Sequence, residues 1–219
     1  MGPTQTAAII DIFDDAGLNI GSVAAGKRSD DLTPTLSGTL SAPLLAGENL
    51  LIFNGTTLLG TASVNNTALT WTYTPTLLPS PGTTYSFIAR VADPAGNLGP
   101  ASPSRSFILD TVAPLATATI TDITDNLSFY TGSIPDGGIT NDSTPTLSGT
   151  LSAALATGDT LRIFNGTTLL GNATVNNTAL TWTFTPTLPA SPGNTYLFSA
   201  AITDAAGNLG TVSTVRSLI

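Results

Sequence analysis

The sequence predicts an all-β protein made of two copies of one antiparallel β-sandwich. The first observation is a repeat, because Thr33–Ala42 recurs letter for letter as Thr144–Ala153, at an offset of 111 residues. Internal repetition of this kind decides the domain organisation before the fold is argued. The second observation is that apolar residues alternate with Thr and Ser over short runs separated by Gly, Pro and Asn, which is typical of half-buried strands. We expect about seven strands in each sandwich.

The repeat also predicts the domain boundaries. We expect one domain at 1–109, a second at 110–219 and a linker around 109–114. Each copy is close to the commonest domain size of about 100–150 residues, so each should bury its own core. Because Pro3 aligns with Pro114, the N-terminus falls at a linker-like position. We expect a piece of a longer array, with a natural two-domain protein as the alternative.

The strands of the first copy are expected, in order, at 7–12, 35–41, 50–53, 58–64, 69–74, 85–91 and 104–109. Asn54-Gly55 predicts a type I′ hairpin turn, since both residues tolerate positive φ. Residues 58, 60, 62 and 64 are expected to share one face. Trp71 is predicted to anchor the core, and Tyr85, after a Pro-rich bend, fits a tyrosine corner.

Composition excludes several classes of function. The chain has no Cys and no His, which removes disulfides, thiol nucleophiles and imidazole bases. Its formal net charge of −8 argues against binding to nucleic acids or anionic membranes, and no apolar run is long enough to span a bilayer. Paired carboxylates could in principle hydrolyse glycosides, but the aromatic residues are needed for the core. We therefore expect a protein that is not an enzyme, inserts into no membrane and is a monomer.

Several motifs in fixed order resemble a known family. Thr-Pro-Thr-Leu-Ser-Gly-Thr (from Thr33), Asn-Gly-Thr-Thr-Leu-Leu-Gly (from Asn54), Asp-Pro-Ala-Gly-Asn (from Asp93) and Leu-Asp-Thr-Val-Ala-Pro (from Leu109) look like the tandem bacterial Ig-like repeats of large secreted surface adhesins. Biofilm-associated proteins and the extender regions of repeats-in-toxin adhesins are similar. The resemblance covers nearly the whole chain. It implies Ig-like sandwiches that act as spacers at the bacterial cell surface, with calcium within or between repeats.

The acidic residues are predicted to bind calcium. Thirteen of the fourteen are Asp, which favours turns and calcium loops because its short side chain reaches nearby donors or a cation. Strand order places Asp110 and the 11–31 loop of the first copy at one end, facing the Asp-x-x-Gly-Asn loop of the second, and Asp110 is expected to belong to neither sandwich. A second site is expected within each 11–31-type loop. The predicted calcium ligands are Asp11, Asp14, Asp15, Asp30, Asp31, Asp93, Asn97, Asp110, Asp122, Asp125, Asp142, Asp204 and Asn208.

Two functions follow from these observations. The first is a calcium-stiffened spacer that holds a ligand-binding tip away from the cell, with neighbouring Ig-like repeats and calcium as its partners. The alternative is a binding module whose loops recognise a glycan or a protein. Near-identical copies favour the spacer, since spacers multiply by duplication and need no exposed aromatic platform.

Overall fold

The computed structural model describes residues 2–127, 131–189 and 193–219. It divides into two compact units, Met1–Val112 and Ala113–Ile219. Each unit is all-β, with no helix in the described ranges, and so no helix there could cross a membrane. The prediction of two antiparallel β-sandwiches is confirmed.

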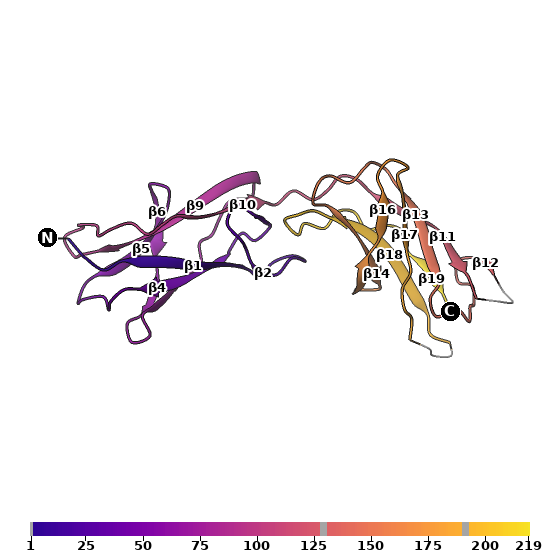
Figure 1. The fold of residues 1–219 in the computed structure, drawn as a ribbon, viewed down its shortest axis with the longest axis horizontal. Coiled ribbons are helices and arrows are strands. Elements are labelled where there is room, and N and C mark those ends of the chain that lie inside the picture. The colour runs from indigo at the N-terminus through magenta and orange to yellow at the C-terminus, as the bar shows by residue number, and fades with distance from the viewer. Residues whose placement is uncertain (1, 128–130, 190–192) are drawn as a thin grey trace. The chain divides into compact units, whose positions relative to one another are not determined.

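The first unit consists of two facing sheets (Figure 1). One sheet has the order β2-β1-β4-β8-β7 and the other β3-β10-β9-β5-β6. Neighbouring strands are antiparallel except β3, which pairs in parallel with β10. The strands are β1 (Ala7–Asp14), β2 (Gly21–Ser22), β3 (Arg28–Ser29), β4 (Thr35–Leu40), β5 (Asn49–Asn54), β6 (Thr57–Thr61), β7 (Ser63–Asn65), β8 (Thr70–Tyr73), β9 (Pro81–Ala92) and β10 (Arg105–Asp110).

The second unit has closely matching sheets, with the orders β12-β11-β13-β17-β16 and β15-β14-β18-β19. In both units the first strand carries a bulge at the same place, between Ile9 and Asp11 and between Ile120 and Asp122. The strands are β11 (Ala118–Asp125), β12 (Gly132–Ser133), β13 (Thr146–Leu151), β14 (Thr160–Asn165), β15 (Thr168–Asn172), β16 (Thr174–Asn176), β17 (Thr181–Phe184), β18 (Tyr196–Thr203) and β19 (Arg216–Leu218).

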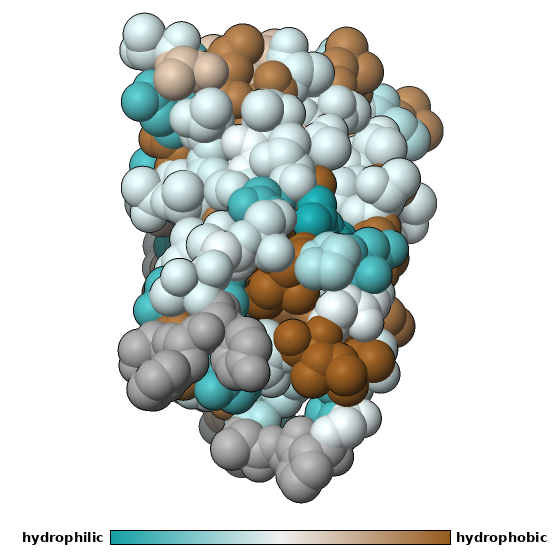
Figure 2. Space-filling model, turned by 90° about the vertical axis from the view of Figure 1, so that its right-hand side faces the viewer, coloured by the Kyte–Doolittle hydropathy of each residue, from teal (hydrophilic) through white to brown (hydrophobic). Residues whose placement is uncertain are grey.

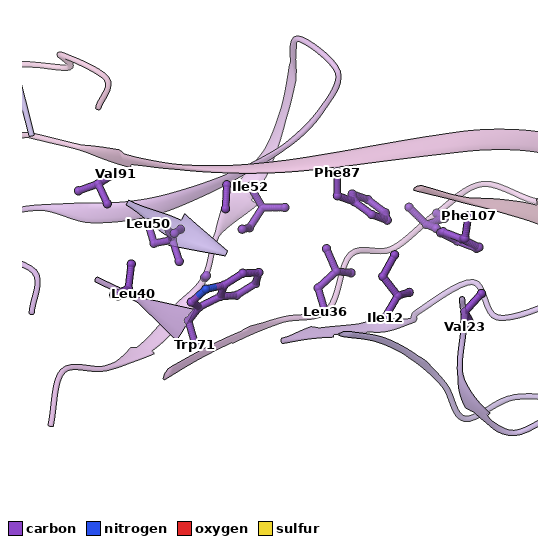
Figure 3. Close-up of a cluster of buried hydrophobic side chains, with 14 of the residues drawn as sticks. Ile12, Val23, Leu36, Leu40, Leu50, Ile52, Trp71, Phe87, Val91 and Phe107 are labelled. Carbon is purple, nitrogen blue, oxygen red and sulfur yellow. The ribbon is translucent and has the colours of Figure 1, made fainter. Parts of the chain in front are cut away.

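The core of the first unit lies between the two sheets. Trp71, from β8, is only 2% exposed, as predicted, and its indole N–H donates to the Thr39 carbonyl at 3.3 Å. Figure 3 shows Leu50 and Ile52 of the opposite sheet pointing toward this indole. Farther along the sandwich, Phe87 and Phe107 form a second group of large buried side chains. Trp182 is also 2% exposed, so both tryptophans anchor cores.

A glycine makes room for each indole. A Cβ atom on Gly38 would lie 1.9 Å from the carbonyl oxygen of Ala8 on β1 and 2.6 Å from the Trp71 ring. Gly149 has the same two distances to Thr119 and Trp182. Contacts this short leave no space for any side chain, because the obstacles are backbone and a packed ring. Gly is therefore required here for close packing.

Three local predictions are wrong. The first is the type I′ turn at Asn54-Gly55, because the hairpin after β5 turns at Gly55 and Thr56 instead. Only Gly55 has a positive φ, of 57°, as at the first central position of a type II′ turn. Leu58 is 53% exposed, because a bulge opposite Phe53 reverses the side-chain parity and Leu59 packs on the core instead. Strand β9 starts at Pro81, inside the expected bend.

The expected tyrosine corner forms in the second unit. The hydroxyl group of Tyr196, the counterpart of Tyr85, donates a hydrogen bond to the carbonyl oxygen of Pro189 at 2.7 Å. Tyr85 itself stacks against Phe87 and Phe107, with ring centroids 6.1 and 5.9 Å away. This tyrosine therefore fixes its strand, β9 or β18, against neighbouring residues, by ring packing in the first unit and by a hydrogen bond in the second.

Candidate functional site

Two buried aspartates are linked through one hydroxyl group at the end of β1. Asp14 and Asp31 are each 1% exposed. Ser29 lies between them, since its hydroxyl group donates to Asp14 Oδ2 at 2.7 Å and accepts the Asp31 backbone N–H at 3.1 Å. Asp31 closes the loop by accepting backbone N–H groups of Asp15 at 3.3 Å and Thr33 at 2.7 Å. The result is a hydrogen-bonded cluster that joins the two ends of the 14–31 loop.

The second unit repeats this cluster with a threonine in place of the serine. The Thr140 hydroxyl group donates to Asp125 Oδ2 at 2.7 Å and accepts the Asp142 N–H at 3.0 Å. Asp142 in turn accepts N–H groups of Asn126 and Thr144 at 3.0 and 2.8 Å. The shared requirement is a hydroxyl group at this position, since each buried carboxylate needs donors to offset the loss of water.

Two carboxylates of these clusters, Asp14 and Asp142, have shifted pKa values. Burial raises the pKa of Asp14 above its ordinary value, and the negative charges of Asp31 and Asp15 raise it further, against hydrogen bonds from Ser29 and Ala16. For Asp142, burial acts in the same direction, but backbone hydrogen bonds from Asn126 and Thr144 outweigh it and lower the pKa. Three carboxylates of the first unit therefore lie near enough to influence one another.

The Asp-x-x-Gly-Asn loops close on themselves. Asp93 Oδ1 accepts N–H groups of Ala95 and Asn97 at 3.0 and 2.8 Å, and Asp93 Oδ2 accepts the Asn97 side-chain amide at 2.8 Å. The Asn97 amide is the main reason that the pKa of Asp93 is lowered. Asp204 and Asn208 make the same contacts in the second unit. The motif thus has a structural role, because the carboxylate caps the turn.

Asp11 and Asp122 lie away from the buried pairs. Asp11 is three residues before Asp14 on β1, so the two side chains point to opposite faces. Asp11 accepts a hydrogen bond from Ser22 at 2.8 Å and lies 3.5 Å from the Arg105 guanidinium. Asp122 likewise accepts from Ser133, which is the main reason its pKa is lowered, and lies 3.7 Å from Arg216.

The sequence reasoning missed these two arginines. Arg105, on β10, reaches across to the other sheet and donates to the carbonyl oxygens of Ile10 at 2.6 Å and Val23 at 3.2 Å. Arg216 does the same with Thr121 and Ile134, at 2.6 and 2.9 Å. Of the six Lys and Arg residues, only this pair occupies matching positions of the two copies. The recurrence of an arginine at this position was the sequence feature that could have predicted a positively charged side chain linking the two sheets.

Asp110 belongs to the first sandwich, so the prediction that it lies in neither is wrong. It is the last residue of β10, pairs with Pro81 of β9, and forms a 2.5 Å salt bridge with Arg28 of β3. The strand continues past Leu109 because β3 and β9 flank it on both sides. The first unit ends at Val112, within the stretch expected to be the linker, 109–114.

The calcium ligands stay a prediction. Within the described ranges, no three Asp or Glu side chains are gathered closely enough to hold a metal ion. The buried pairs already accept several protein donors, whereas calcium takes six to eight oxygens. Asp15 is exposed, and Asp30 packs against Gly17. A calcium ion bound beside Asp14 and Asp31 would therefore need further oxygen ligands, and the exposed carboxylate of Asp15 is the proposed additional one.

One face of the molecule and the largest described hollow lack the features of a sugar-binding platform. On the face shown in Figure 2, most of the surface is drawn pale, for weakly polar residues, and the apolar patches are small and separate. A hollow of about 540 Å³ in the second unit is lined by residues that include Ile134, Pro135, Ile139 and Asn141, with no aromatic side chain among its described lining. This hollow therefore offers no aromatic ring on which a sugar could stack.

Comparison with known proteins finds a family match within the second unit. Residues 117–219 match the family model of the bacterial Ig-like domain. No curated protein matches the chain. The bacterial Ig-like domain is a structural, non-catalytic fold. The first unit, outside the match, has a closely similar strand order, with β3 as an additional edge strand, and a similar buried polar cluster.

Proposed function

We propose that the two units are spacer repeats of a bacterial surface adhesin. The observation that supports this best is that both units repeat the same internal framework. It consists of a Trp over a Gly, an Arg between the sheets, and a hydroxyl group that links one buried aspartate to the backbone of another. These matching residues serve the fold of each unit. The lining of the larger described hollow includes no aromatic residue, and that of the smaller one includes Tyr196, whose hydroxyl group is bonded to Pro189. Repeated units that share such a folding framework are suited to act as spacers, which hold another domain at a fixed distance.

A display experiment tests the spacer role. One, two or four copies of the chain would be placed between a cell-surface anchor and an unrelated binding domain, and adhesion to ligand-coated glass measured under flow. We expect adhesion to rise with copy number, because each folded unit adds a fixed length. A Gly-Ser linker of equal residue count is the control, since a flexible chain of this size spans roughly 80 Å and lengthens only as the square root of its length.

Two outcomes would contradict the spacer proposal. Adhesion that is independent of copy number would show that these units do not determine reach. Adhesion by the units without the binding domain, or a specific hit when the purified chain is screened against glycans, would favour the alternative of a ligand-binding module.

Calcium is the second part of the proposal. Its support is the group of Asp14, Asp31 and Asp15, whose mutual repulsion a divalent cation would relieve. Binding only to the folded state raises stability by about 2.7 kcal/mol at a hundredfold excess over Kd. We expect the melting temperature to rise in calcium and fall in chelator, with magnesium less effective because it demands tighter octahedral geometry.

A matched variant makes the calcium test specific. Asp15 is exposed, so Asp15→Asn should leave the fold intact and remove one negative charge from the group. We expect this variant to be at least as stable as the wild type in chelator, because one source of repulsion is removed, and to lose much of the calcium increment. The calcium proposal fails if the wild-type melting curves coincide in calcium and chelator, whatever the display experiment shows about spacing.

A further inference from the structure

The first and last strands of each unit belong to different sheets. In the first unit, β1 lies in the sheet of β4, whereas β10 lies in the sheet of β9. The same separation holds for β11 and β19 in the second unit. Tension along a chain of such units would enter each one at its first strand and leave at its last. Because a hydrogen-bond ladder joins only strands of one sheet, this load has to cross between the sheets through side chains and loops.

The chain enters and leaves the first unit at opposite ends of β9. Gly99 bonds to Val91 near the end of β9, and a Cβ atom on Gly99 would lie 2.8 Å from the carbonyl oxygen of Pro3. Asp110 pairs with Pro81, the first residue of the strand. β9 has 12 residues and therefore spans roughly 40 Å. Figure 1 shows β1 extending along the same direction, so tension would slide β1 and β10 past each other along the length of the unit.

Arg105 bonds directly from β10 to β1. Its two guanidinium Nη atoms donate to the carbonyl oxygens of Ile10 and Val23, at 2.6 and 3.2 Å. Ile10 is the residue that the bulge leaves out of the pairing with β4, because the pairing passes from Ile9 to Asp11. A bulge disrupts the ladder at its extra residue. The carbonyl group on β1 that the arginine binds is therefore that of the bulged residue.

The second unit repeats this arrangement with a different bulged residue. Arg216 donates to the carbonyl oxygens of Thr121 and Ile134. The pairing of β11 with β13 passes from Ile120 to Asp122, so Thr121 is the residue left out. The bulged side chain is thus Ile in one unit and Thr in the other, whereas the bulge, its carbonyl group and the arginine recur. The shared role of the bulge depends on its backbone.

We propose that each bulge and its arginine form a mechanical lock, which determines how long the unit withstands tension between its first and last strands. Hydrogen bonds from a charged group are about twice as strong as neutral ones. The Arg105 side chain is 26% exposed, so water competes only partly for them. Its planar fork holds two carbonyl groups at once, so both bonds have to break before β1 slides past β10. The lock rests on the proposed spacer function for its use, because a spacer transmits the pull on a bound tip.

Optical tweezers can load the first unit in two directions. The chain has no cysteine, so two introduced cysteines provide unique attachment points. Thr4→Cys with Val112→Cys, both at exposed positions, loads β1 against β10. Thr56→Cys with Thr84→Cys is the control geometry, because both residues are exposed and lie in the sheet of β10 or its hairpin turn, so the load need not cross to β1. The lifetime of the folded unit at constant force is measured in each geometry.

Arg105→Met should shorten the lifetime about tenfold when the load runs from β1 to β10, because charge-assisted hydrogen bonds are lost before the strands slide. In the control geometry the lifetime should change less than about twofold. Arg105→Lys is the gentler variant, since it keeps the charge and much of the stem. It should still shorten the lifetime several-fold in the first geometry, because an ammonium group has no planar fork.

Arg28→Met tests a competing load path. Arg28 forms a salt bridge with Asp110, which joins β3 to β10 within one sheet. The lock is overturned if Arg28→Met shortens the lifetime more than Arg105→Met, if both Arg105 variants leave it unchanged, or if they shorten it equally in the two geometries. The last result would mean that Arg105 supports stability alone. Reach in the display experiment is measured separately, so failure of the lock and failure of the spacer role can be told apart.

Discussion

Replacing Trp71 by alanine should lower the unfolding free energy of the first unit by about 3–5 kcal/mol. The reason is that Trp71 is among the largest fully buried side chains and contacts both sheets, so its removal leaves a cavity that backbone strands cannot close. For a domain of about 100 residues this corresponds to a fall in melting temperature of many degrees. Chemical denaturation followed by hydrogen exchange of peptides from each unit measures the effect.

The second unit provides the matched control. Trp182 occupies the equivalent position with the same 2% exposure, so Trp182→Ala should destabilise the second unit and leave the first unchanged. Each unit has its own cluster of buried residues, which is why the effects should be separable. A loss of both transitions from either single substitution would contradict independent cores.

Gly38→Ala should destabilise the first unit by about 3 kcal/mol, at the upper end of the usual range for overpacking. Its Cβ atom would lie 1.9 Å from the Ala8 carbonyl oxygen and 2.6 Å from the Trp71 ring. Neither obstacle is a flexible side-chain end, so β1 would have to move away from β4 or the indole would have to leave its position. Urea unfolding of the variant, followed by hydrogen exchange of peptides from the first unit, measures the cost.

Thr39→Ser is the control for this substitution. Thr39 is the next residue on β4 and its side chain is exposed, so a conservative change there should cost less than about 1 kcal/mol. The double variant Gly38→Ala, Trp71→Phe adds a second check. The smaller ring should recover part of the loss, since residues in contact show interaction energies of about 0.5–3 kcal/mol. A cost for Gly38→Ala no greater than that for Thr39→Ser would refute the close-packing explanation.

Much of the architecture could be predicted because it depends on local patterns. The repeat of Thr33–Ala42 as Thr144–Ala153 predicts two similar units, and the period of two residues around Trp71 predicts a strand with the indole inward. The predicted alternation of core-facing and outward-facing residues was wrong at Leu58, where the bulge opposite Phe53 adds a residue to one strand. A bulge depends on the pairing of two strands, so a single run of sequence does not reveal it.

The candidate site was predicted less well, and only the tertiary structure decided the roles of its carboxylates. The sequence by itself determined that the acids are almost all Asp. Calcium was predicted because these residues were expected to gather in loops, whereas Asp14, Asp110 and Asp125 are the last residues of strands. The pairing of Asp110 with Arg28 joins residues 82 positions apart, and Arg105 reaches Ile10 across 95 positions. Such partners are set by strand order and register, because a short Asp side chain bonds to whichever donor the neighbouring strand presents.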